Sequence, residues 1–194
     1  TAGISAVTAG TSNFVAGVNA GDSITSGGNN NTLIGDNAGT TITTASNNTA
    51  VGSRAMIANT SGADNTAVGE QALTVNTTGA NNTAIGKAAL LLNTTASYNT
   101  VVGSSAMYNN TTGSNNVAVG FQSLQQNTTA YQNTAVGTTA LKSTTTGLDN
   151  TGVGFSAMFA NTTGYNNTAV GKSSLAANTT GQQNVAVGSS SMLA

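Results

Sequence analysis

Residues 65–81 read N-T-A-V-G-E-Q-A-L-T-V-N-T-T-G-A-N, and the same pattern returns every seventeen residues along most of the 194-residue chain. The first glycine of the pattern marks the period without any insertion. In each of ten turns an asparagine lies four residues before this glycine, and a valine or isoleucine lies directly before it. The glycines are Gly35, Gly52, Gly69, Gly86, Gly103, Gly120, Gly137, Gly154, Gly171 and Gly188. A short period without insertions predicts a repeat architecture in which each turn packs on its neighbours.

Two more positions of the repeat are nearly constant, and we call residues that share a position in successive turns a column. The asparagine column comprises Asn31, Asn48, Asn65, Asn82, Asn99, Asn116, Asn133, Asn150, Asn167 and Asn184. Four residues after the glycine, nine turns have leucine or methionine, and this column contains every methionine of the chain. It comprises Met56, Leu73, Leu90, Met107, Leu124, Leu141, Met158, Leu175 and Met192.

The first thirty residues fit the repeat less well. Residues 13–30 form a degenerate turn with one extra residue, in which Gly17 takes the glycine position and Ile24 the position of Asn76. Residues 1–12 are expected to be the second half of a turn, with Ile4 in the leucine/methionine column. We therefore predict degenerate N-terminal turns over residues 1–30 and regular repeats over residues 31–194. Together they form one continuous domain of about eleven turns.

The length of the period decides between helices and strands. Helical repeats need about 33 residues or more, so seventeen residues are too few for a helix pair. The Thr-Ala-Val stretch of the repeat is compatible with a strand, because Thr and Val favour strands. In a solenoid each such strand pairs in parallel with its copy in the next turn, about 4.8 Å away. The sequence therefore predicts an all-β chain folded as a parallel β-solenoid (β-roll) with seventeen residues per turn.

Alternation along each strand predicts which side chains face the interior. The threonine of the stretch is replaced by Val117 and Val185 in two turns, which suggests that this side faces an apolar interior. We therefore expect the Val/Ile column to point inward and the alanine between the two positions to point outward. The inward column comprises Val51, Val68, Ile85, Val102, Val119, Val136, Val153 and Val170. The outward column comprises Ala50, Ala67, Ala84, Ala118, Ala135, Ala169 and Ala186. Leucine and methionine are expected to form a second buried column.

The polar columns also have structural interpretations. Asparagines stacked one strand apart are expected to form a ladder of amide hydrogen bonds. The invariant glycine indicates a tight corner that requires a positive φ or a close backbone approach. At the second corner Gly62 is replaced by Ala96 two turns later, which argues against such a requirement there. Glu70 and Lys87 share a column in neighbouring turns and are expected to pair.

The composition excludes several classes of function. The chain has no Cys, His, Pro or Trp, and only nine charged residues with a net charge of −1. Without His or Cys it lacks the usual catalytic triads and zinc sites, and its five acidic residues are scattered. We predict that the chain is not an enzyme and holds no metal or cofactor. Without a basic patch we expect no nucleic-acid partner, and no apolar run approaches the roughly 20 residues of a membrane span.

Aromatic and large apolar residues occupy two of the variable columns. Tyr131, Leu148 and Tyr165 share one column on successive turns. Phe121 and Phe155 share another column, two turns apart. These residues are candidates for surface contact with a glycan or a neighbouring chain. The alternative is that they form a local hydrophobic seal over the corners, and the sequence leaves both interpretations open.

A third group of candidates has the form of N-glycosylation acceptors, Asn followed by Thr-Thr or Thr-Ser. One repeat that contains such a triplet generates many copies, so we favour the alternative that these are ladder-forming corner residues. The asparagines are Asn59, Asn76, Asn93, Asn110, Asn127, Asn161 and Asn178.

The motif Asn-Thr-Ala-Val-Gly, at residues 65–69 and 133–137, resembles the repeats of trimeric autotransporter adhesin heads. The longer consensus is similar to repeats of bacteriophage tail fibres and related surface proteins. The resemblance covers residues 31–194 well and residues 1–30 weakly. It implies a β-roll, a trimeric state and an extracellular or virion-surface location, and it implies no catalytic residues.

These observations predict a structural subunit of an extracellular fibre or filament. We expect it to assemble with copies of itself through uncapped solenoid ends, and laterally as a trimer through the smooth alanine column. Unpaired strand edges at the ends and the low surface charge both favour association. A second hypothesis is an adhesin-like module that recognises a glycan or a surface through one solenoid face. Ice binding through a threonine array is a third.

Overall fold

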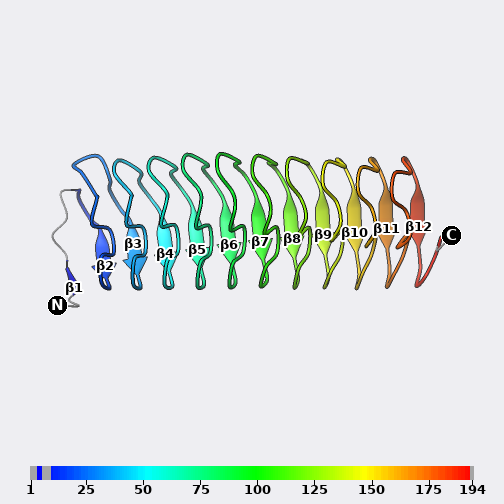
Figure 1. The fold of residues 1–194 in the computed structure, drawn as a ribbon, viewed down its shortest axis with the longest axis horizontal. Helices are drawn as coiled ribbons and strands as arrows, with labels where there is room; N and C mark the ends of the chain where they lie inside the picture. The colour runs from blue at the N-terminus through cyan, green and yellow to red at the C-terminus, as the bar shows by residue number, and fades with distance from the viewer. Residues whose placement is uncertain (1–3, 6–9, 193–194) are drawn as a thin grey trace.

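The computed structural model describes residues 4, 5 and 10–192 and shows a nearly straight rod in which all strands lie side by side (Figure 1). Every turn of the rod contributes one short strand. The strands of the described residues are β1 (Ile4–Ser5), β2 (Phe14–Ala16), β3 (Thr32–Ile34), β4 (Thr49–Val51), β5 (Thr66–Val68), β6 (Thr83–Ile85), β7 (Thr100–Val102), β8 (Val117–Val119), β9 (Thr134–Val136), β10 (Thr151–Val153), β11 (Thr168–Val170) and β12 (Val185–Val187).

The register of the sheet follows the sequence repeat. Strands β2 to β12 pair in parallel with their chain neighbours, as in the pair Thr66 and Thr83 seventeen residues apart. Between β2 and β3 the shift is eighteen residues, from Phe14 to Thr32, so the extra residue predicted in the first turn is present. The eleven parallel strands make about ten turns, and the predicted parallel β-solenoid is confirmed.

The N-terminal strand differs from the prediction. β1 pairs with β2 in the antiparallel direction, with Ile4 opposite Ala16, so Ile4 does not occupy the leucine/methionine column. Only residues 6–13 separate the two strands, and a parallel crossover needs a dozen residues or more. The outer edge of β2 is therefore paired within the chain, and the N-terminal edge is not the open parallel edge that we expected.

The predicted orientation of the strand side chains is wrong in phase. Ala67 is fully buried, whereas Val68 and Thr66 on either side of it point outward and are partly exposed. Asn65 is also buried, so alternation along 65–68 places Asn and Ala inside and Thr and Val outside. The Val/Ile column was predicted to be buried, but it points outward. It comprises Val51, Val68, Ile85, Val102, Val119, Val136, Val153 and Val170. The alanine column was predicted to point outward, but it is fully buried or nearly so. It comprises Ala50, Ala67, Ala84, Ala118, Ala135, Ala169 and Ala186.

The leucine/methionine column is buried from Met56 to Leu175, as predicted, and fills the interior opposite the alanines, whereas Met192 in the last described turn is 47% exposed. Leu73, Leu90 and Met107 have no exposed surface. The sequence did not indicate that these residues adopt a left-handed backbone, with φ of +51° at Leu73 and +44° at Met107. For a residue with a Cβ this conformation costs roughly 1–2 kcal/mol. The corner thus offsets part of the stabilisation that the buried side chain contributes.

The invariant glycine has the positive φ that we predicted. Gly69 has a φ of +136°, and a Cβ there would lie 2.6 Å from the carbonyl carbon of Gly86 in the next turn. Both conformation and space therefore exclude a side chain. At the second corner Gly62 and Gly79 have no positive φ, in agreement with the alanines found there in other turns.

Candidate functional site: the strand face and its borders

The outward side of strands β3 to β12 is a continuous surface that we call the strand face. It consists of two rows of side chains that run along the rod, because the first and third residues of each strand point outward. The first row comprises Thr32, Thr49, Thr66, Thr83, Thr100, Val117, Thr134, Thr151, Thr168 and Val185. The second row comprises Ile34, Val51, Val68, Ile85, Val102, Val119, Val136, Val153, Val170 and Val187. The strand face therefore carries only hydroxyl and hydrocarbon groups.

Threonine hydroxyls of the strand face differ from those of the corners. At the corner, Thr77 Oγ1 donates a hydrogen bond of 3.0 Å to the carbonyl oxygen of Thr94 in the next turn. The same bond recurs at Thr43, Thr60, Thr94, Thr111, Thr128, Thr145 and Thr162. On the strand face, none of the eight threonine hydroxyls bonds to another of the described residues. These hydroxyls remain available to solvent or to a ligand.

The predicted asparagine ladder lies beneath the strand face, although Asn133 Nδ2 bonds to the carbonyl oxygen of Gly147 and not to Asn116 Oδ1, so that step has the main-chain link alone. The main-chain N–H of Asn82 donates to Asn65 Oδ1 at 3.0 Å, and Asn82 Nδ2 donates to the same oxygen at 3.1 Å. The main-chain link recurs at every step from Asn31 to Asn184. The Nδ2 of Asn82 also donates to the carbonyl oxygen of Ala96 across the interior, at 2.9 Å. This first ladder ties each strand to the next turn and to the opposite corner.

The asparagines of the candidate glycosylation triplets form a second ladder. Asn76 Nδ2 donates to Asn59 Oδ1 at 2.9 Å and to the carbonyl oxygen of Gly79 at 2.9 Å. Asn59, Asn76, Asn93, Asn110, Asn127 and Asn161 are fully buried, and Asn178 is half-buried. The folded chain therefore does not present these amides for modification, and the ladder interpretation is the one that the contacts support.

The second ladder is interrupted where Thr144 replaces asparagine. Thr144 is fully buried, and its Oγ1 has no hydrogen-bond partner. The Oδ1 of Asn127, which an asparagine at 144 would reach, is also buried without a partner. A buried polar atom without a partner costs about 1–3 kcal/mol, so this step is a weak point of the rod.

Aromatic residues border the strand face on both sides. Phe121 and Phe155 lie at the corner after the strands and are 49% and 54% exposed. Tyr131 and Tyr165 lie at the corner before the strands and are 45% and 40% exposed, with Leu148 half-buried between them. The phenylalanines and the tyrosines thus alternate from turn to turn. Phe159 is not among the residues that the sequence predicted for surface contact, and its ring lies 5.9 Å from Lys142 Nζ.

Charged residues are few and lie outside the strand face. Lys87 Nζ and Glu70 Oε2 are 2.9 Å apart, which confirms the predicted pair. Within residues 10–192 no three carboxylate or other metal-binding side chains gather in one place. None of the described residues belongs to a helix long and apolar enough to cross a membrane.

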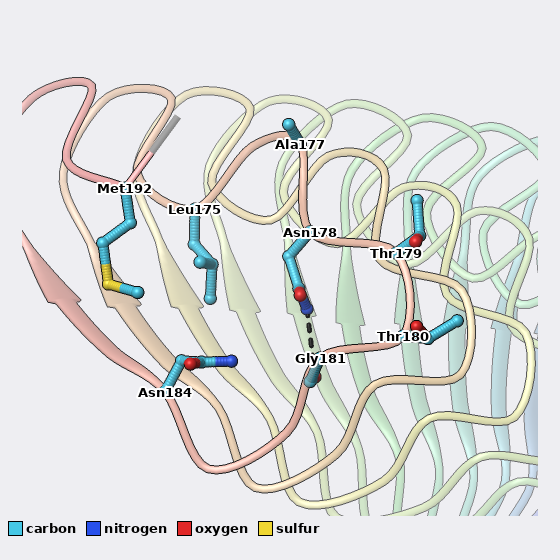
Figure 2. Close-up of a pocket in the computed structure, with 8 residues that line it drawn as sticks. All are labelled: Leu175, Ala177, Asn178, Thr179, Thr180, Gly181, Asn184 and Met192. Carbon is cyan, nitrogen blue, oxygen red and sulfur yellow. Dashed lines mark hydrogen bonds between the residues drawn. The ribbon is translucent and has the colours of Figure 1, made fainter. Parts of the chain in front are cut away.

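One hollow of about 380 Å³ lies at the C-terminal end of the rod (Figure 2). Leu175 and Met192 of the leucine/methionine column line it, together with Asn178 and Asn184 of the two ladders. Figure 2 shows the side chains of Leu175 and Met192 lying side by side in this space. Since these four residues belong to the core columns, the hollow reaches the interior of the rod at its last described turns.

Comparison with models of protein families, with curated proteins and with solved structures found no match. The repeat and the fold define the class of the protein. It is a parallel β-solenoid repeat protein with seventeen-residue turns.

Proposed function

We propose that the chain is a structural subunit of an extracellular fibre, on a cell or virion surface. The observation that carries this proposal is the direction of the hydrogen bonds. Main-chain bonds and both asparagine ladders join one turn to the next along the rod axis. Such a rod is stabilised by adding turns, and its length grows without any change in cross-section. The resemblance to adhesin heads and tail fibres supports the same role.

The last strand supports assembly along the axis. The main-chain N–H of Thr168 donates to the carbonyl oxygen of Asn184, and the corresponding N–H of Val185 points to the open side of β12. Val185 and Val187 are 69% and 70% exposed. A further turn, from a second copy or from the same polypeptide, would pair with this edge. A lateral trimer is no longer supported by the alanine column, which is buried, and rests on the resemblance alone.

A proline at position 185 tests the axial assembly. Val185→Pro removes the main-chain N–H that would donate a hydrogen bond to a carbonyl oxygen of a following turn, because proline has no amide hydrogen. Val185→Thr is the matched control, since threonine occupies this position in most turns. We expect micromolar wild-type chain and the threonine variant to form axial oligomers in analytical ultracentrifugation, and the proline variant to form fewer. A wild-type chain that stays monomeric and soluble would refute the proposal.

The aromatic borders support a second candidate, a module that binds a neutral glycan. Phe121 and Phe155, like Tyr131 and Tyr165, are two turns apart, or about 9.6 Å. Exposed aromatic rings stack on the apolar faces of sugar rings, and a periodic polymer would meet them repeatedly. Affinity electrophoresis in neutral polysaccharides would test this. Phe155→Ala should lose retardation, whereas Phe14→Ala, in the first turn, should retain it.

A further inference from the structure

We propose that the strand face binds ice. The face has two rows of β-branched side chains on a straight rod, and none of its positions from β3 to β12 is charged. Charged groups hold their own hydration shells and would disturb an ordered layer of water. The nearest charged columns, which include Asp64 before the strands and Glu70 after them, lie outside the two rows.

The chemistry of the first row suits ordered water. Each threonine presents a methyl group and a hydroxyl, and the hydroxyl donates one hydrogen bond and accepts two. Since none of these hydroxyls bonds to the rest of the described residues, each is available to bond to water. The methyl groups of both rows restrict the orientations of the water beside them. The corner threonines do not offer this combination, because their hydroxyls bond to the main chain of the next turn.

The geometry of the face is regular in two directions. Neighbouring strands are about 4.8 Å apart, and the two rows are separated by two residues of about 3.3 Å each. The spacing along the rod is close to the repeat of oxygen atoms in rows of hexagonal ice. Threonine, valine and isoleucine are restricted at χ1, so the side chains hold this lattice with little freedom. The first ladder fixes the strands beneath them.

The size of the face argues against a second copy of the chain as its occupant. The ten strands of the face, each three residues long, cover about 480 Å² at these spacings. A stable protein interface buries about 800 Å² on each partner, so this face alone is too small. An ice surface has no such requirement, because it is flat, and it meets every position of both rows at once.

Two tyrosine variants provide the test. Thr100 on the strand face and Thr112 at the corner are both exposed, and neither hydroxyl bonds to another described residue. We expect the wild-type chain to show thermal hysteresis and to inhibit ice recrystallisation. Thr100→Tyr places a ring above the face and should reduce the hysteresis several-fold, whereas Thr112→Tyr should leave it unchanged. Circular dichroism verifies that both variants are folded.

A gain-of-function variant keeps the test decisive if Thr100→Tyr does not fold. Val117 interrupts the threonine row in the middle of the rod, and Val117→Thr should raise the hysteresis. The proposal is overturned if the wild-type chain depresses freezing no more than a non-binding protein at equal concentration. Equal loss in both tyrosine variants also overturns it. So does a concentration-dependent dimer without hysteresis that Thr100→Tyr dissociates, since the face would then bind a second copy.

Discussion

The first two turns and the later turns fill the same cross-section with different residues. In most of the later turns, leucine or methionine fills the interior, with alanine on the strand and asparagine in the second ladder, as at Leu73, Ala67 and Asn76. In the first two turns glycine takes the leucine/methionine position. Isoleucine then takes the asparagine position, and the strand residue is valine or leucine. These residues are Gly21 with Ile24 and Val15, and Gly39 with Ile42 and Leu33.

Contacts around Gly39 show why the two sets are equivalent. Gly39 has a φ of +57°, and a Cβ there would lie 2.8 Å from Ile42 Cδ1 and from Leu33 Cδ2. Two larger neighbours therefore occupy the space of the missing side chain. The exchange removes the left-handed strain of a leucine and also removes one step of the second ladder. Core volume is thus conserved across the turn as a whole, and single columns are not.

The largest expected effect comes from applying half of this exchange. Met56→Gly in the third turn leaves a cavity, because Ala50 and Asn59 do not fill it. We expect a loss of about 2–5 kcal/mol in the free energy of unfolding, measured by urea denaturation. Adding Ala50→Leu and Asn59→Ile copies the preceding turn and should recover most of the loss. A triple variant that is less stable than Met56→Gly would show that the two cores are not interchangeable.

A second test concerns the first ladder, which both regions share. Asn31 Nδ2 donates to Asn13 Oδ1 at 3.1 Å, just as in the later turns. Asn116→Ala deprives the main-chain N–H of Asn133 of its acceptor, whereas the Oδ1 of Asn99 keeps the main-chain N–H of residue 116 as a donor. A buried group without a partner costs about 1–3 kcal/mol, and the melting temperature should fall accordingly. Asn109→Ala, at a surface amide, is the control, and an equal effect of the two would contradict the importance of the ladder.

The interruption of the second ladder predicts a gain in stability. Thr144→Asn would allow one amide to bond to Asn127 Oδ1, which now has no partner. We expect an increase of about 0.5–1.5 kcal/mol in the free energy of unfolding, the net contribution of one hydrogen bond. Thr146→Asn, at an exposed position of the same corner, should have no effect. A neutral result for Thr144→Asn would mean that the step is already satisfied in solution.

The smallest expected effect on stability comes from an ion pair at the surface, where the first two turns and the later turns do not need different residues. Glu70 and Lys87 are both more than half exposed, so their pair contributes about 0–1 kcal/mol. Glu70→Gln should lower the melting temperature slightly at low salt, and the difference should vanish at high salt. A larger loss that persists in salt would indicate that the pair maintains the register of the turns.

The periodic part of the structure could be predicted from the sequence, because spacing alone determines it. The seventeen-residue register, the first ladder and the φ of Gly69 follow from positions that never vary, and the buried Leu73 column follows from a position that is leucine or methionine in nine turns. The phase of the strand could not be deduced from Val117 in the threonine row, because an outward position tolerates valine as well. Buried Asn65 was the better guide, since a ladder that also bonds across the interior to Gly79 must point inward.

Other features of the fold could not be predicted from the residues of any one column. Leucine has no intrinsic preference for the left-handed backbone conformation that Leu73 adopts. This conformation follows from the closure of the turn. The antiparallel β1 depends on the length of residues 6–13 more than on their identity. The strand face became a candidate site only when the structure showed that the valines point outward. The aromatic residues were predicted to contact a partner, but their arrangement along two edges of the strand face was not predicted.

The register of the two ladders has a consequence for the gene. Any cut and rejoining that removes one period, such as residues 99–115, would place Asn116 above Asn82 and restore every column. Recombination that adds or removes a whole repeat therefore lengthens or shortens the rod by whole turns and keeps every column in register. Selection can adjust the reach of such a protein in discrete steps, independently of any substitution on its surface.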